Sequence, residues 1–182
     1  MLGFYRNSPA PGDVKICDVL DSVLSFYGPA IRSCKIIVEK RYDSGVVIRG
    51  FPGEITQVFS NLVGNALEAL TPEGTLEVHV LASRDWGNPT RHGVRVFIAD
   101  NGPGISAENR RRIFEPFFTT KGENGTGLGL WVATGIVEKH GGWIRMRSST
   151  HPGRSGTCFG VFFPQQKVPT MRHATVTLDK SA

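Results

Sequence analysis

Two glycine-dense segments constrain this chain more than any other feature of its sequence. They are residues 100–104 (DNGPG) and residues 125–130 (GTGLGL), and an aromatic segment at residues 114–118 (FEPFF) lies between them. Glycine lets the backbone pass close to a ligand and present bare N–H groups to it. The second segment runs into a helical pattern, so its N–H groups are expected at a helix N-terminus, where phosphate is favoured. The sequence therefore predicts a nucleotide-binding protein.

The composition narrows the class of protein. A chain of 182 residues fits one domain with a substantial core, and 40% hydrophobic with 20% charged residues is ordinary for a globular protein. The net charge is +5, but the only basic run is 110–112. This run reads either as a solvated helix face or as an electropositive rim beside a phosphate site. No basic stripe with interleaved aromatic residues is present, so we expect no nucleic-acid partner.

The cysteines and the hydropathy of the sequence indicate the cellular compartment that we expect for the protein. Cys17, Cys34 and Cys158 are odd in number and widely spaced, without metal-ligand spacing. This pattern favours a reducing, cytoplasmic compartment with buried thiols. No apolar run approaches membrane-spanning length, and a membrane anchor on a longer parent protein stays open.

The periodicity of apolar residues predicts an α+β fold. We expect a two-layer sandwich in which one mixed, mostly antiparallel sheet carries helices on one face. The predicted helices are 13–33, capped by Asp13 and kinked or ended by Pro29, then 53–70 and 127–140. The predicted strands are 35–40, 45–50, 74–82, 93–100, 142–148 and 156–163. Residues 1–12 read as a linker, and 165–182 as a tail, either disordered or with an added edge strand.

The helix predicted at 53–70 carries an unusual polar stripe. The stripe is separate from the broad apolar face and consists of Glu54, Gln57, Asn61, Asn65 and Glu68. It is either a solvent face or a ligand-facing one, and mid-helix asparagine, a poor helix former, favours the ligand. An asparagine amide oxygen is a hard, neutral ligand that suits Mg²⁺ already held by phosphates.

The end of the strand at 93–100 and the segment after it supply further candidate residues. Asp100 closes the strand, where its carboxylate can accept a hydrogen bond from a ligand amine while the glycines turn the chain beneath it. An ordinary Asp-Asn-Gly turn is the alternative. Residues 105–124 form a long polar connection with one short helix near 107–113, typical of a functional lid or of disorder. The phenylalanines of 114–118 would pin this segment to the body or to a partner, and Lys121 would meet a phosphate or solvent.

Taken in order, these motifs resemble the catalytic, ATP-binding domain of sensor histidine kinases. Residues 61–66 look like the N box, 100–105 like the first glycine box and 114–118 like the F box. Residues 125–130 look like the second glycine box, and 156–159 (GTCF) like the closing strand motif. The wider superfamily includes gyrase-type topoisomerases, heat-shock chaperone ATPases and mismatch-repair ATPases. The resemblance covers residues 13–164 and implies a Bergerat-type ATP-binding fold with residues 105–124 as its ATP lid.

The resemblance also implies roles for individual residues. Asp100 reads the adenine amino group, Asn65 holds Mg²⁺ with Asn61 beside it, and the backbone of 127–129 cradles phosphate. The remaining implied nucleotide contacts are Gly102, Gly104, Ile105, Phe114, Thr120, Lys121, Gly125, Thr126, Gly127, Leu128, Gly129, Leu130 and Thr157. Asn61, Glu68 and Lys121 are the implied catalytic residues.

The residue at position 61 separates the members of the superfamily. In the ATP-hydrolysing relatives a glutamate stands there as a general base, whereas Asn61 cannot take a proton. A neutral histidine nitrogen is already a nucleophile, so transfer to histidine needs no such base. We therefore expect a histidine kinase. A protein serine kinase of the anti-sigma type is disfavoured by the F box and the long lid, and a nucleotide-binding regulatory module without transfer activity is the other alternative.

The acceptor histidine of such a kinase belongs to a separate helical hairpin. The histidines here, His79, His92, His140, His151 and His173, all lie away from the N-terminus, where that hairpin belongs. Residues 2–6 look like the last turn of its helix. We expect an excised catalytic domain, monomeric by itself, which binds Mg-ATP without phosphorylating itself. Its expected partners are the histidine-containing dimerisation domain of a homodimeric parent and a response regulator receiver domain.

Overall fold

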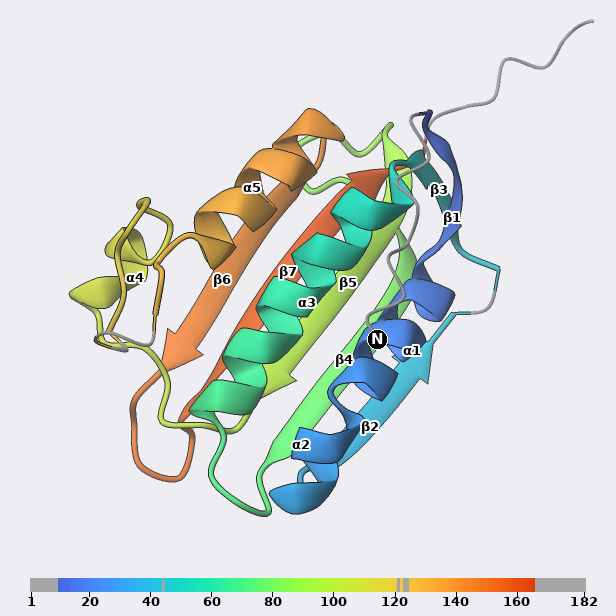
Figure 1. Cartoon of the computed structure of the whole chain (residues 1–182). Helices are drawn as coiled ribbons and strands as arrows, with labels where there is room; N and C mark the ends of the chain where they lie inside the picture. Colours follow the sequence, from blue (N-terminus) through green and yellow to red (C-terminus); the bar gives the residue numbers. More distant parts are fainter. Residues whose placement is uncertain (1–9, 44, 121, 123–124, 166–182) are drawn as a thin grey trace, which may run out of the picture.

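The computed structural model describes residues 10–43, 45–120, 122 and 125–165. They form a five-stranded sheet of order β2-β4-β5-β7-β6, with α1, α3 and α5 on one face and a two-stranded β1-β3 ribbon beside it (Figure 1). The strands are β1 Gly12–Lys15, β2 Ile37–Tyr42, β3 Val47–Gly50, β4 Thr75–Arg84, β5 His92–Asp100, β6 Trp143–Ser149 and β7 Gly156–Pro164. The helices are α1 Ile16–Phe26, α2 Gly28–Ser33, α3 Pro52–Ala69, α4 Asn109–Arg112 and α5 Gly129–Lys139.

The five-stranded sheet is mixed and mostly antiparallel, as the sequence predicts. β2 pairs with β4 in parallel, while the β4–β5, β5–β7 and β6–β7 pairs are antiparallel. Alternate side chains of the central strands point toward the helices and are buried: Leu76, Val78, Val80, Val94, Val96, Ile98, Phe159, Val161 and Phe163. Period-two alternation with one buried face is what an antiparallel sheet covered on one side requires. The predicted α+β two-layer architecture is confirmed.

Helix α3 is the central helix of the covering layer. It begins with Pro52 in its first turn, where the missing N–H costs no intrahelical bond. Its apolar face is buried against the sheet: Ile55, Val58, Phe59, Leu62, Val63 and Ala66. The Phe59 ring meets that of Phe163 edge-on at 6.2 Å between centroids, and thereby joins helix to sheet. Because α3 is buried along this face, the orientation of the polar stripe on its opposite side is fixed.

The N-terminal helix is shorter than predicted. Asp13 is not its cap, because residues 12–15 form β1, in which Asp13 is paired with Arg49 of β3. The helix begins at Ile16, and the break predicted at Pro29 occurs at Tyr27, with Pro29 in the first turn of α2. Helical spacing continues through this region, but pairing with β3 satisfies the backbone of residues 12–15 as strand, a tertiary effect that local periodicity does not contain.

The His140 side chain, at the end of α5, makes two hydrogen bonds with backbone groups. Its Nε2 accepts a hydrogen bond from the Phe51 N–H at 3.1 Å, so its proton is on Nδ1, which donates to the Ile136 carbonyl at 2.8 Å. The ring thus joins the end of α5 to the start of α3.

Residues 1–9 and 166–182, on which the hairpin-helix turn, most of the linker and most of the tail were predicted, lie outside the described residues. Among the residues that are described, no helix is long and apolar enough to cross a membrane.

Candidate nucleotide-binding site

Asp100 lies at the end of β5, a central strand, opposite Thr157 of β7. Its Oδ1 accepts a hydrogen bond from the Gly102 N–H at 2.9 Å. A Cβ on Gly102 would crowd this carboxylate and the Ala69 carbonyl, each at 2.9 Å, so the turn beneath Asp100 needs glycine. Burial raises the pKa of Asp100, while hydrogen bonds from the Gly102 and Thr157 backbones lower it. The site therefore offers a half-buried carboxylate that accepts hydrogen bonds from backbone N–H groups.

The start of the 105–124 segment is fixed to the sheet by a residue that the sequence reasoning missed. The Ile105 N–H donates to Ser148 Oγ at 2.7 Å, and Ser148 in turn contacts Thr157 Oγ1 at 3.0 Å. Gly104 has a φ of +76° and packs so closely on the Ser149 carbonyl that any Cβ would overlap it. The available signal was the alternation of β6, because Ser148 continues the inward-facing row of Ile144 and Met146 as a polar residue.

Asn101, which the sequence reasoning assigned only to a turn, fastens the first glycine box to β4. Its side-chain Oδ1 accepts the Thr75 N–H at 2.8 Å, and its own N–H donates to the Thr75 carbonyl at 3.3 Å. This pairing mimics one more step of the sheet ladder. The DNG turn is therefore anchored on both sides, at β4 and at β7.

The polar stripe of α3 faces α5 along part of its length. Asn61 donates from Nδ2 to the Gly129 carbonyl in the first turn of α5 at 2.9 Å. Two turns earlier, Glu54 pairs with Lys139 at 2.6 Å. The stripe is thus neither a plain solvent face nor wholly ligand-facing, because part of it joins the two helices.

The other stripe residues lie nearer the first glycine box. Asn65 is half-buried one turn after Asn61, and Glu68 is exposed one turn later still. The pKa of the Tyr27 hydroxyl is raised by burial and then by the charge of Glu68, which places Glu68 near the α1–α2 junction. Tyr27 itself donates to the Ser60 carbonyl at 3.2 Å. Glu68 therefore lies close enough to this junction for its charge to act on Tyr27.

The second glycine box forms a turn that leads into α5. The helix begins at Gly129, two residues later than predicted, and its N-cap Leu128 makes no side-chain capping bond. Gly127 has a φ of +66°, and a Cβ there would overlap the Phe117 backbone. The first turn of α5 thus presents backbone N–H groups next to the F box. This is the arrangement that phosphate favours.

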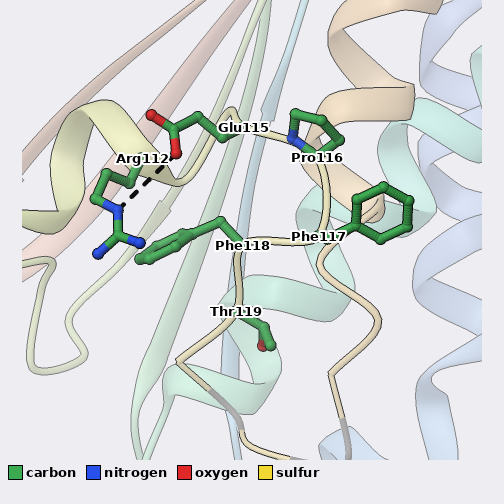
Figure 2. A pocket seen from close by; sticks show the side chains of 6 residues that line it. All are labelled: Arg112, Glu115, Pro116, Phe117, Phe118 and Thr119. Carbon is green, nitrogen blue, oxygen red and sulfur yellow. Dashed lines mark ion pairs between the residues drawn. The ribbon is translucent and has the colours of Figure 1, made fainter.

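The three phenylalanines of the F box have different environments. Phe114 is half-buried and packs against the core, and the Arg112 guanidinium lies 4.3 Å from the centre of the Phe118 ring. Arg112 also pairs with Glu115 at 3.9 Å. Phe117 is 74% exposed, adopts a φ of +65°, and points away from this cluster (Figure 2). A pinning role thus fits two of the phenylalanines, while the third projects into solvent.

An open hollow of about 470 Å³ borders the F box, lined by residues 112 and 115–119 (Figure 2). It does not include Asp100 or the second glycine box. The 110–112 run is not a plain solvated face, because Arg110 Nε donates to the Ile105 carbonyl at 3.1 Å and Arg112 covers Phe118. Lys121 lies outside the described residues, and Thr120 is exposed.

The donor set suits a metal that arrives with its ligand. The described residues contain no group of three or more His, Cys, Asp or Glu side chains that could hold a metal ion. Asn65 offers an amide oxygen, which is a weak ligand alone but an adequate one for Mg²⁺ held mainly by phosphates and water. The residues present therefore fit a magnesium–nucleotide complex.

Comparison with known proteins agrees with this arrangement. Residues 50–167 match the family described as histidine kinase-, DNA gyrase B-, and HSP90-like ATPase. The chain is 37% identical over 162 residues to the sensory histidine kinase/phosphatase NtrB of Rhodobacter capsulatus, covering 86% of this chain and 44% of that protein. The chain thus spans less than half the length of this relative.

Two solved structures of one histidine kinase share the fold. The catalytic domain of histidine kinase ThkA, in a nucleotide-free form, superposes with a TM-score of 0.71 at 28% identity, over 85% of this chain and 97% of that one. ThkA in complex with response regulator protein TrrA gives a TM-score of 0.69 at 25% identity, over 86% and 42%. The chain therefore belongs to the histidine kinase-, DNA gyrase B-, and HSP90-like ATPase family, and its ATP-binding domain is of the sensor histidine kinase type.

Proposed function

We propose that this domain binds Mg-ATP and transfers its γ-phosphoryl group to a histidine on a separate dimerisation domain. The observation that carries the proposal is the Asp100 carboxylate, half-buried at a strand end above a turn that only glycine fits. Such a carboxylate accepts a hydrogen bond from the exocyclic amine of adenine and disfavours a carbonyl oxygen at the same place. Recognition of adenine rather than guanine follows.

The phosphates would lie toward the second glycine box. The backbone N–H groups of residues 127–129 and the uncapped start of α5 favour anions there. Asn65 would complete the shell of Mg²⁺, whose charge would neutralise the phosphates. We assign nucleotide contacts also to Gly125, Thr126, Leu130 and Thr120, and a phosphate contact to Lys121, as the resemblance implies.

Transfer, rather than hydrolysis, is supported by the side chains along α3. Asn61 has no ionisable group and donates to the Gly129 carbonyl, so it positions α5 instead of activating water. Glu54 is paired with Lys139 two turns before Asn61, whereas Glu68 lies one turn after Asn65, toward the first glycine box. We assign Glu68 a modest part in catalysis. Because the attacking imidazole is neutral, positioning and charge neutralisation suffice for the reaction.

The acceptor domain would dock beside the start of α5. Phe117 is 74% exposed and Trp131, in the first turn of α5, is 51% exposed. Since Gly127 packs on the Phe117 backbone, both apolar side chains belong to this end of the helix. Exposed aromatic residues at one place favour a protein partner. The ThkA–TrrA complex supports a response regulator receiver domain as the second partner.

Two measurements test the proposal in sequence. Isothermal titration of the chain with ATP and GTP, with and without Mg²⁺, is expected to show Mg²⁺-dependent binding with preference for ATP. The chain is then incubated with γ-labelled ATP and a separate histidine-containing dimerisation domain. Acid-labile, base-stable label on that domain, and none on the chain itself, is the expected result.

The alternatives give different outcomes. ATP binding without transfer would favour a nucleotide-binding regulatory module, and acid-stable label on a serine would favour the anti-sigma type of kinase. Rapid release of inorganic phosphate without an acceptor would favour an ATPase. Acid-labile label on the isolated chain would contradict the proposed location of the acceptor histidine.

A further inference from the structure

Ser148 stands where three parts of the site meet. It lies near the end of β6, its Oγ donates to the Gly156 carbonyl at 2.9 Å, and it accepts the Ile105 N–H at 2.7 Å. Its third contact is with Thr157 Oγ1 at 3.0 Å. One half-buried hydroxyl thus connects β6, the start of β7 and the first residue of the 105–124 segment.

The hydrogen-bonding capacity of this hydroxyl is fully used. A serine hydroxyl has one proton and two acceptor lone pairs. The proton goes to the Gly156 carbonyl, so the Thr157 hydroxyl must be the donor in the contact between the two side chains. The backbone N–H of Thr157 acts on the Asp100 carboxylate. Removing the Ser148 hydroxyl would leave the Ile105 N–H and the Thr157 hydroxyl without this acceptor.

Ile105 is held on both sides of its peptide. Its N–H is bound by Ser148, and its carbonyl accepts from Arg110 Nε at 3.1 Å. The preceding Gly104 is packed against the Ser149 carbonyl without room for a Cβ. Because the peptide is held on both sides and Gly104 is packed on β6, these contacts set the direction in which the chain leaves the sheet at Ile105.

We propose that Ser148 is a positioning residue for nucleotide binding: its hydroxyl fixes the point at which the 105–124 segment leaves the sheet, next to Asp100 and Thr157. The proposal rests on the proposed function, since it gives that same site its mechanical anchor. Ser148 touches no reacting atom. It acts through Ile105, because a displaced segment start would move the residues that approach the phosphates away from those that hold the base.

The central variant is Ser148→Ala, with Ser149→Ala as its matched control. Ser149 is the next residue of β6, and its hydroxyl only accepts the His151 N–H in the turn at 3.2 Å. Both changes remove one serine hydroxyl from the same strand. We expect Ser148→Ala to weaken Mg-ATP binding about tenfold, the fold-change of about one hydrogen bond lost at a buried donor, and Ser149→Ala to change it less than about twofold.

Two further readouts separate positioning from a general loss of stability. Amide exchange in the nucleotide-free protein is expected to speed up in residues 104–113 of Ser148→Ala, with β2 and β4 unchanged. In transfer assays the KM for ATP is expected to rise while kcat at saturating ATP stays close to that of the unaltered chain, because bound nucleotide restores the segment. A merely structural serine would raise exchange evenly and leave KM unchanged below the unfolding temperature.

A second pair of variants covers a failure of Ser148→Ala to fold. Arg110→Ala releases the other side of the Ile105 peptide from a half-buried position, and Arg111→Ala, at the exposed neighbouring residue, removes the same charge. We expect faster exchange at residues 104–113 only in the first. Equal behaviour of the two members of either pair would overturn the proposal. A chain that binds no Mg-ATP would overturn the proposed function instead, while the exchange comparison would still decide the role of Ser148.

Discussion

The two glycine boxes look alike in sequence but are held in different ways. The first is tied to β4 by Asn101, to β7 by Asp100, and to β6 by the bond from Ile105 to Ser148. The second contacts the F box through Gly127 and leads into a helix start without a side-chain cap. In the first box, glycine allows close packing against the strands of the sheet. In the second box, glycine leaves backbone N–H groups open at the start of a helix. The proposed base-binding end is therefore pre-organised, whereas the proposed phosphate-binding end is built from a loop.

The largest expected difference between the boxes is in stability. Gly104→Ala adds a Cβ at positive φ against the fixed Ser149 carbonyl, and we expect it to lower the free energy of unfolding by about 3 kcal/mol. Gly127→Ala also has a positive φ, but the Phe117 backbone it meets lies in the F box rather than in a strand of the sheet, so about 1 kcal/mol is expected. Urea unfolding of both variants measures the difference. Equal losses would mean that the second box is held as rigidly as the first.

The next largest effect is expected on the preference for adenine over guanine. Asp100→Asn keeps an oxygen for the Gly102 N–H but loses the charge, so ATP affinity is expected to fall about 100-fold and to approach that for GTP. Isothermal titration with both nucleotides measures it. Asp43→Asn is the control, because Asp43 accepts a backbone N–H from Ala82 at 3.1 Å, far along β4 from the site. A retained preference for ATP would remove Asp100 from the base site.

The same variant has a pH signature. Burial raises the pKa of Asp100, so the folded protein binds this proton more tightly than the unfolded chain does. The contribution of this group to stability is therefore complete below the unfolded pKa of about 3.9 and is lost as the pH rises through the folded pKa. Asp100→Asn does not titrate, so its stability relative to the unaltered chain is expected to increase across that window. Urea unfolding at several pH values measures this, and a stability of the variant relative to the unaltered chain that falls with rising pH would contradict it.

Dependence on magnesium is expected only at the phosphate end. Asn65→Ala removes the proposed amide ligand, so affinity for ATP in the presence of Mg²⁺ is expected to drop about tenfold, toward its value without the metal. Gln57→Ala, at an exposed position of the same helix, is the control. Titrations with and without Mg²⁺ give the comparison. An unchanged response to Mg²⁺ would exclude Asn65 as a ligand.

The smallest effect on nucleotide binding is expected at Phe117. Its side chain is 74% exposed, so Phe117→Ala should leave ATP affinity unchanged and slow transfer to the acceptor domain about tenfold through lost docking. Phe26→Ala, which truncates a 65% exposed phenylalanine on α1, is the matched control. Transfer assays over a range of acceptor concentrations measure both. Equal transfer rates in the two variants would place the docking surface elsewhere.

Much of the fold was predictable because its signals are local. The two-layer arrangement is predicted by the alternation of apolar residues in β4, β5 and β7 and by the apolar face of α3. Each pattern matches the period of its own element. The second sheet was missed because β1 is only residues 12–15 and is strand through its pairing with β3. Helical spacing that continues into residues 16–26 concealed it.

The candidate site divides along the same line. Asp100, Asn65 and the glycines carry their signal in residue type and order, so sequence alone predicted a nucleotide site and the residues at its two ends. The tertiary structure alone decided that Asn61 bonds to α5, that Ser148 holds Ile105, and that Phe117 projects while Phe114 is packed. The physical reason is that residue type and spacing act within one segment, whereas each of these contacts joins segments that only the packed sheet and helices bring together.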